Sequence, residues 1–187
     1  MTPHPLAVRL VEHLRASPAA RVLEFGCGRG RNTEALRAAG LTVVALDDRT
    51  AGSSAPLEGL SGPFAGALST HGLLHGTPAA IGAALAGIAG LLAGGAPLYA
   101  TFGSVRDARF GSGQRIEEFT YASESGDERG VAHAFFGRDR LRELLGAHFA
   151  IGSLEEHDAG QSAGQWAHSD RPLSGAVHWF AIATKVR

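Results

Sequence analysis

The sequence has very little cysteine, almost no excess charge and no long apolar run. Cys27 is the only cysteine among 187 residues, which excludes an internal disulfide and favours a reducing compartment. A net charge of −1 leaves no basic footprint for nucleic acid. The longest apolar stretch, residues 79–92, contains glycines and is too short to span a bilayer. No signal-peptide pattern is recognisable. We therefore expect a cytoplasmic protein that binds neither nucleic acid nor a membrane.

The composition is that of an ordinary globular protein. Hydrophobic residues make up 44% and charged residues 19%, and 187 residues suffice for one substantial core. Neither an internal repeat nor an interdomain linker divides the sequence. We therefore expect a single domain over residues 1–187.

A glycine-rich turn between an apolar segment and a helical segment is the most informative motif. Residues 21–25 predict a strand, glycines follow at positions 26, 28 and 30, and residues 31–39 predict a helix. Glycine allows positive φ and close approach to a ligand, and the helix N-terminus offers free N–H groups. About 20 residues further on, the predicted strand 42–46 ends in Asp47, and a carboxylate there can accept both hydroxyls of a ribose. The motif predicts a binding site for a ribose-containing ligand.

The spacing of the glycines separates two kinds of nucleotide site. A dinucleotide fingerprint is G-x-G-x-x-G, whereas this sequence has G-x-G-x-G followed by Asn32 and Thr33, and its first strand carries Glu24 near its end. The segment resembles the first motif of class I S-adenosylmethionine (SAM)-dependent methyltransferases. The resemblance implies that Glu24 lies near the methionine moiety, that the glycine loop underlies the ligand, and that Asp47 holds the ribose. An ordinary turn in a βαβ unit and a dinucleotide site remain open alternatives.

Two later blocks extend the resemblance over residues 20–103. Residues 67–75 resemble the motif at the fourth strand of the same superfamily, and residues 91–98 resemble the L-x-P-G-G turn before the fifth strand, with Ala93 in place of the usual proline. The sequence departs from many relatives at Ala65, where an aspartate is common, and the segment after the second strand lacks the acidic residue that many relatives place near the adenine amine, so adenine recognition stays open. The cofactor-binding residues that the resemblance implies are Glu24, Gly26, Cys27, Gly28, Gly30, Asn32, Asp47, Asp48, Ser69 and Thr70.

Strands that alternate with helices predict an α/β fold. We expect a Rossmann-like, mostly parallel sheet with helices on both faces. Residues 49–63 show almost no strand pattern, so the third strand is expected to be short or missing. Residues 149–154 and 177–185 predict two final strands, with one antiparallel strand near the C-terminus, as class I methyltransferases have.

Residues 103–136 leave the alternating pattern and are expected to form an inserted cap. Within this segment, residues 117–122 and 131–135 predict a hairpin. Residues 132–136, the predicted helix 138–145 and residues 149–156 resemble the tail of tellurite-resistance-type methyltransferases.

The acceptor side offers histidines but no dedicated catalytic motif. His71 and His75 follow the predicted strand 64–68, where acceptors bind in this superfamily, and we assign His71 to acceptor positioning. Their i, i+4 spacing resembles half of a metal site, but no carboxylate or third histidine lies nearby in sequence, so we expect no metal. Glu117 and Glu118 are candidates for a cap over the acceptor, or for a solvated loop.

We predict a methyltransferase that moves the methyl group of SAM to a small-molecule acceptor by in-line displacement. A sulfonium donor is already activated, so positioning and a dry site suffice, and a general base is needed only for a protonated acceptor. A SAM-binding protein without transferase activity and an NAD(P)-dependent reductase are the alternatives. The reductase would need a Tyr-x-x-x-Lys pair, and neither Tyr99 nor Tyr121 has a lysine four residues on. A homodimer is compatible with the sequence and stays open.

Overall fold

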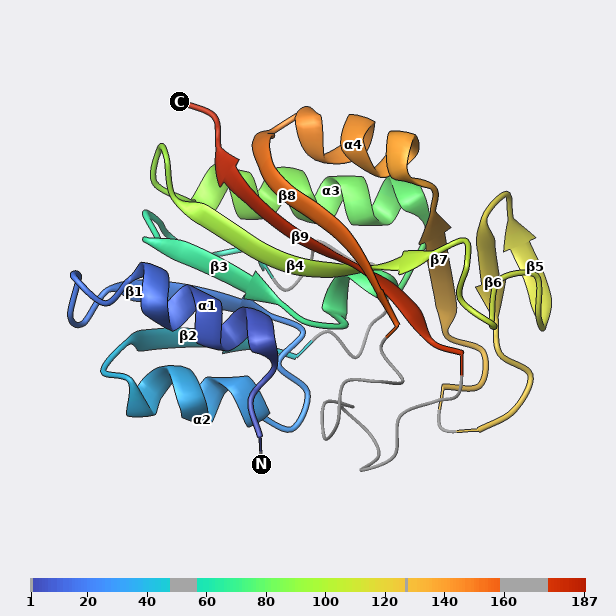
Figure 1. Ribbon diagram of the computed structural model, residues 1–187, viewed down its shortest axis with the longest axis horizontal. Coiled ribbons are helices and arrows are strands. Elements are labelled where there is room, and N and C mark those ends of the chain that lie inside the picture. The colour runs from blue at the N-terminus through green and yellow to red at the C-terminus, as the bar shows by residue number, and fades with distance from the viewer. Residues whose placement is uncertain (1, 48–56, 127, 159–174) are drawn as a thin grey trace.

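A computed structural model of the chain describes residues 2–47, 57–126, 128–158 and 175–187. Helices and strands alternate in its first half, and strands dominate its second half (Figure 1). The elements are α1 (Pro5–His13), β1 (Arg21–Phe25), α2 (Arg31–Ala38), β2 (Thr42–Leu46), β3 (Gly66–Ser69), a short 3-10 turn η2 (Gly72–Leu74), α3 (Pro78–Leu91), β4 (Pro97–Ser104), β5 (Gln114–Glu117), β6 (Thr120–Ala122), β7 (Ala132–Phe136), α4 (Arg138–Gly146), β8 (Phe149–Asp158) and β9 (Val177–Lys185).

The predicted sheet is confirmed. Strands β2, β1, β3 and β4 are parallel neighbours in that order. Strand β9 runs antiparallel to both β4 and β8, and is thus the antiparallel strand near the C-terminus. The described residues between β2 and β3 form no further strand, as expected, and the sheet ends at β2.

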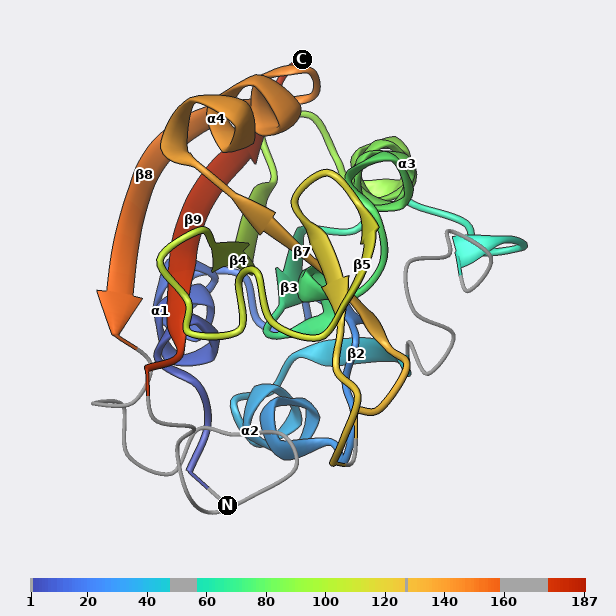
Figure 2. The ribbon, with the colours of Figure 1, turned by 90° about the vertical axis from the view of Figure 1, so that its right-hand side faces the viewer.

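Helices cover both faces of the sheet, because the central strands carry buried apolar side chains on both faces. On β1, Val22 packs with α1 and α2, whereas Leu23 packs with α3 and α4. On β4, Tyr99 belongs to the core with α1 and α2, and Leu98 belongs to the core with α3 and α4. Figures 1 and 2 show α1 and α2 on one side of the sheet and α3 and α4 on the other. The alternation that defines a strand therefore also creates two separate cores.

The predicted cap hairpin is present with one more strand than expected. Strands β6 and β7 pair antiparallel, and β5 pairs antiparallel with β6. Residues 117–122 were predicted as one strand, which is wrong: Phe119 has φ +62°, and the chain turns back there. In Figure 1 this hairpin extends beyond β7 at one end of the sheet.

Strand β7 continues along the edge of β4 beyond the end of β3. Residues 98–100 of β4 pair with β3, whereas Gly103 and Ser104 pair with β7. A Cβ at Gly103 would lie 2.5 Å from the carbonyl oxygen of Ala134, so glycine is needed for this close approach. The cap strand therefore lies beside the segment that follows β3, at the carboxyl ends of the parallel strands.

Candidate active site

The glycine loop, residues 26–30, connects β1 to α2 and is fixed by its neighbours. The N–H groups of Gly26 and Cys27 both donate to the carbonyl oxygen of Leu46 at the end of β2, with N···O distances of 2.9 and 2.8 Å. Gly26 has φ +78°, and a Cβ there would lie 2.5 Å from the Cα of Gly72. A Cβ built on Gly28 would meet no described atom within 4 Å. Packing therefore requires a glycine at position 26, whereas position 28 faces open space.

Glu24 is buried at the base of this loop. Its side chain is 1% exposed, and the hydroxyl of Thr33 in α2 donates a hydrogen bond to its Oε2. Burial raises the pKa of the Glu24 carboxyl, although hydrogen bonds from Thr33 and Asn32 act in the opposite direction. A cationic ligand group beside Glu24 would stabilise its ionised form. Its assignment to the methionine moiety stays a prediction.

Asn32 joins three segments that are far apart in sequence. Its Nδ2 donates to Oγ1 of Thr70 at 2.8 Å, and its Oδ1 accepts from the backbone N–H of His4 at 2.8 Å. Asn32, Thr70 and the neighbouring Ser69 are all buried. These contacts show that Asn32 and Thr70, both predicted to bind the cofactor, join α2 to the end of β3, and that Asn32 also joins α2 to the residue before α1. Direct ligand contact by these residues stays a prediction.

Carboxylates lie on either side of the loop. Asp47 follows β2 and is exposed, as expected for a group that meets a ligand from outside. Burial raises the pKa of the Cys27 thiol, and the charges of Glu24 and Asp47 raise it further. Cys27 is therefore not an activated nucleophile. Asp48, also predicted to bind the cofactor, lies outside the described residues.

Three histidines meet beyond the end of β3. The ring of His71 lies 5.7 Å from that of His4 and 5.3 Å from that of His178 in β9. Burial lowers the pKa of His4 to about 3 and that of His178 to about 4, and it also holds the pKa of His71 well below 6.5. The three imidazoles are therefore neutral at neutral pH. Such a group can accept or donate a hydrogen bond without placing a positive charge at the site.

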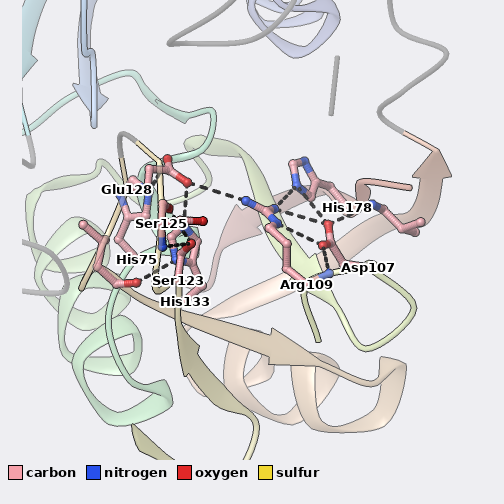
Figure 3. Close-up of polar contacts among 10 residues, drawn as sticks. His75, Asp107, Arg109, Ser123, Ser125, Glu128, His133 and His178 are labelled. Carbon is pink, nitrogen blue, oxygen red and sulfur yellow. Dashed lines mark hydrogen bonds and ion pairs between the residues drawn. The ribbon is translucent and has the colours of Figure 1, made fainter. Parts of the chain in front are cut away.

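A partly buried ion pair in the cap meets this histidine cluster (Figure 3). Asp107 accepts from Nε and Nη2 of Arg109 at 3.0 and 3.2 Å, and from the backbone N–H of Val177 at 2.9 Å. Burial alone would raise the pKa of Asp107, but the contacts with Arg109 outweigh it and lower that pKa. Nη2 of Arg109 also lies 3.2 Å from Nε2 of His178. This contact joins the cap to β9.

A second polar group connects the cap to the segment after β3. Nε2 of His75 lies 3.6 Å from Oε1 of Glu128, and Nε2 of His133 lies 3.1 Å from Oε2 of the same carboxylate. Nη1 of Arg109 is 3.6 Å from Oε2 of Glu128, and Figure 3 shows Arg109 between Glu128 and Asp107. A backbone bridge between His75 and His133 docks the cap on the segment after β3.

Several predicted candidates separate in the structure. His71 and His75 belong to different polar groups, and Glu117 and Glu118 are exposed. Trp179 is buried and donates to the Phe136 carbonyl oxygen, which is a core role. The site residues that the sequence did not reveal are His4, Asp107, Glu128 and His178. These four converge only through folding, and no local spacing indicates them.

Element order, strand directions and the glycine loop together define the fold of class I SAM-dependent methyltransferases. Solved structures agree. A methyltransferase from Methanosarcina mazei has a TM-score of 0.71 and 17% identity, with 100% of this chain and 99% of that chain covered. The 1,6-didemethyltoxoflavin N1-methyltransferase of Burkholderia thailandensis, crystallised with S-adenosylhomocysteine, has a TM-score of 0.68 and 25% identity over 98% of this chain and 78% of that one.

A TehB-like SAM-dependent methyltransferase from Corynebacterium glutamicum has a TM-score of 0.55 and 16% identity over 96% of this chain and 87% of that chain. The suspected class therefore fits, and the likeness to the Corynebacterium protein is one of fold. No protein-family model and no curated protein matches the sequence. The structural likeness is thus the evidence for the class.

Proposed function

We propose that this chain transfers the methyl group of SAM to a small-molecule acceptor by in-line displacement. The observation that carries the proposal is the loop at the carboxyl end of β1. Gly28 leaves open space there, Glu24 is buried at the base, and Asp47 follows the adjacent strand. In open α/β sheets, ligands bind beyond the carboxyl ends of the strands.

SAM is assigned to this edge by its chemistry. Its ribose hydroxyls would donate to the exposed carboxylate of Asp47, and its methionine part would lie toward Glu24. The space beside Gly28 would take the part of the ligand that runs between them. The Burkholderia neighbour was solved with S-adenosylhomocysteine, which supports this assignment.

The histidine cluster suits attack on a sulfonium ion. The leaving group of the reaction is neutral, so the protein mainly has to align the acceptor behind the methyl group and exclude water. Because burial keeps His4, His71 and His178 neutral, the cluster places no positive charge near the sulfonium. A buried imidazole of low pKa is a weak base, so we assign His71 to hydrogen bonding and positioning of the acceptor rather than to strong general-base catalysis.

A small acceptor is favoured over a macromolecule. We assign the acceptor to the space between the segment after β3 and the cap, residues 103–136. Both segments belong to the single domain that we propose for residues 1–187. Polar side chains come from both segments: His71 lies in the segment after β3, and the Asp107–Arg109 ion pair lies in the cap. The toxoflavin-type substrate of the Burkholderia neighbour is a small ring system, which agrees with this choice.

The test is turnover of SAM to S-adenosylhomocysteine across a panel of small acceptors, followed by mass spectrometry and compared with SAM binding by calorimetry. We expect at least one acceptor to be methylated in proportion to enzyme. Tight SAM binding without any product from a broad panel would favour a SAM-binding protein without transferase activity. Saturable NADPH binding without SAM binding would favour the reductase alternative.

The proposal also covers the cellular location of the protein, its partners and its oligomeric state. None of the helices in the described ranges is long and apolar enough to cross a membrane. We place the protein in the cytoplasm, without a nucleic-acid partner, on the charge balance and the single cysteine. A homodimer remains a proposal that light scattering of the purified chain would test.

A further inference from the structure

The cluster of His75, Glu128 and His133 lies at the junction of the cap with the segment after β3 (Figure 3). His75 follows η2, His133 lies in β7, and Glu128 precedes β7. One nitrogen from each histidine and one oxygen from the carboxylate all lie within 4.8 Å of one another. Two imidazoles and a carboxylate are the ligand set that many catalytic zinc sites use.

The tautomer of His133 carries the argument further. Its Nδ1 lies 3.0 Å from the carbonyl oxygen of Val131, and because a carbonyl can only accept, Nδ1 must carry the proton. In the neutral ring, Nε2 then presents a lone pair. That atom is buried and lies 3.1 Å from the Glu128 carboxylate, to which it donates no hydrogen bond in this tautomer. A lone pair that faces a carboxylate is repelled by it unless a cation, either a metal ion or a second ring proton, lies between them.

We propose that this cluster binds a divalent transition-metal ion, of which Zn²⁺ is the test case, through Nε2 of His75, Nε2 of His133 and a carboxylate oxygen of Glu128. Metal–ligand bonds of about 2.1 Å place tetrahedral ligand atoms about 3.4 Å apart. The observed separations of 3.6 and 3.1 Å to Glu128 lie on either side of that value. A ligating histidine usually donates its other ring N–H to a carbonyl or carboxylate, as His133 does to Val131.

The site is held in place by contacts that need no ion. His75 and His133 form a backbone bridge, and the N–H of Gly76 donates to the carbonyl oxygen of Ala132 at 2.7 Å. The two rings are 4.9 Å apart and almost perpendicular. Arg109 also approaches Glu128, but its charge is offset by the contacts with Asp107. Three protein ligands leave a coordination position open, as in catalytic rather than structural zinc sites.

The site goes beyond methyl transfer, and its test does not depend on activity. Untagged protein is stripped with a chelator, and binding of Zn²⁺ is measured by calorimetry and binding of Co²⁺ by its visible absorption. We expect one ion per chain and a Co²⁺ band of four-coordinate intensity. Glu128→Gln and His75→Ala each alter a direct ligand and should weaken binding by at least the 10- to 100-fold that loss of an outer-shell partner causes.

His157→Ala is the matched control. His157 also faces a carboxylate, with Nε2 3.3 Å from Oε2 of Glu155, but it belongs to no three-ligand group among the described residues. This variant should bind Zn²⁺ like the wild type. The proposal is overturned if folded wild type shows no saturable binding, or if Glu128→Gln binds as tightly as wild type. In either case a second ring proton on His133, and not a metal ion, would lie between Nε2 and the Glu128 carboxylate. The methyltransferase proposal would be unaffected.

Discussion

Acidification is expected to destabilise this protein through histidines that the fold keeps neutral. The pKa of His4 falls from 6.5 to about 3, mainly by burial, and that of His178 to about 4. Because these folded-state pKa values are depressed, the unfolded chain takes up protons first as the pH falls. The stabilisation is fully present above pH 6.5 and is lost toward the folded-state values. Between pH 7 and pH 5 each histidine should cost about 2 kcal/mol, against a typical total of about 5–15 kcal/mol.

His4→Asn isolates one of these contributions. The Nδ1 of His4 accepts from the backbone N–H of Leu6 as the N-cap of α1, and asparagine retains a capping acceptor without titrating. At pH 7 the variant should lose about 1 kcal/mol, because the ring contact with Phe180 at 4.9 Å disappears. The difference in stability between pH 7 and pH 5 should shrink by about 2 kcal/mol relative to wild type.

The assay is urea unfolding followed by circular dichroism at both pH values. His13→Asn is the control, since His13 is exposed in the last turn of α1. The control separates the effect of removing a buried imidazole from the effect of removing any imidazole at α1. If His4→Asn and wild type lose the same free energy between pH 7 and pH 5, His4 does not titrate as the structure implies, and the reasoning from burial is refuted.

Further substitutions test the loop and the acceptor side. Asp47→Ala should weaken SAM binding by about 1–3 kcal/mol without unfolding, and unchanged calorimetric affinity would remove Asp47 from the site. Gly28→Val should weaken SAM binding similarly by filling the open space, which calorimetry also checks. Gly26→Ala should destabilise more than Gly28→Ala in urea, because only its Cβ meets Gly72 at 2.5 Å; equal losses would refute the packing argument. His71→Ala should lower the single-turnover rate more than SAM affinity once an acceptor is known, and a rate within twofold of wild type would exclude it from the acceptor side.

Much of the fold could be predicted because its determinants are local. The apolar runs in β1 and β4, the glycines around α2 and the Thr77 cap with Pro78 at the start of α3 all act within a few residues. The hairpin turn at Phe119 could not be predicted, since a positive φ at a phenylalanine depends on the strand pairing around it. Strand pairing is set by the whole sheet rather than by that residue.

The acceptor-side polar groups were beyond sequence reasoning for a different reason. His75 and His133 are 58 positions apart in the numbering, and they meet because β7 continues the edge of β4 past the end of β3. Asp107 and His178 meet because β9 pairs antiparallel with β4. These polar groups therefore form only when the strands pair, whereas the glycine loop is encoded in one short segment.

The most direct test of the central claim is calorimetric titration of wild type and Asp47→Ala with SAM, S-adenosylhomocysteine and NADPH. We predict saturable binding of SAM and S-adenosylhomocysteine at one molecule per chain, weaker binding to folded Asp47→Ala, and no saturable binding of NADPH. Saturable binding of NADPH, with none of SAM, would contradict the account.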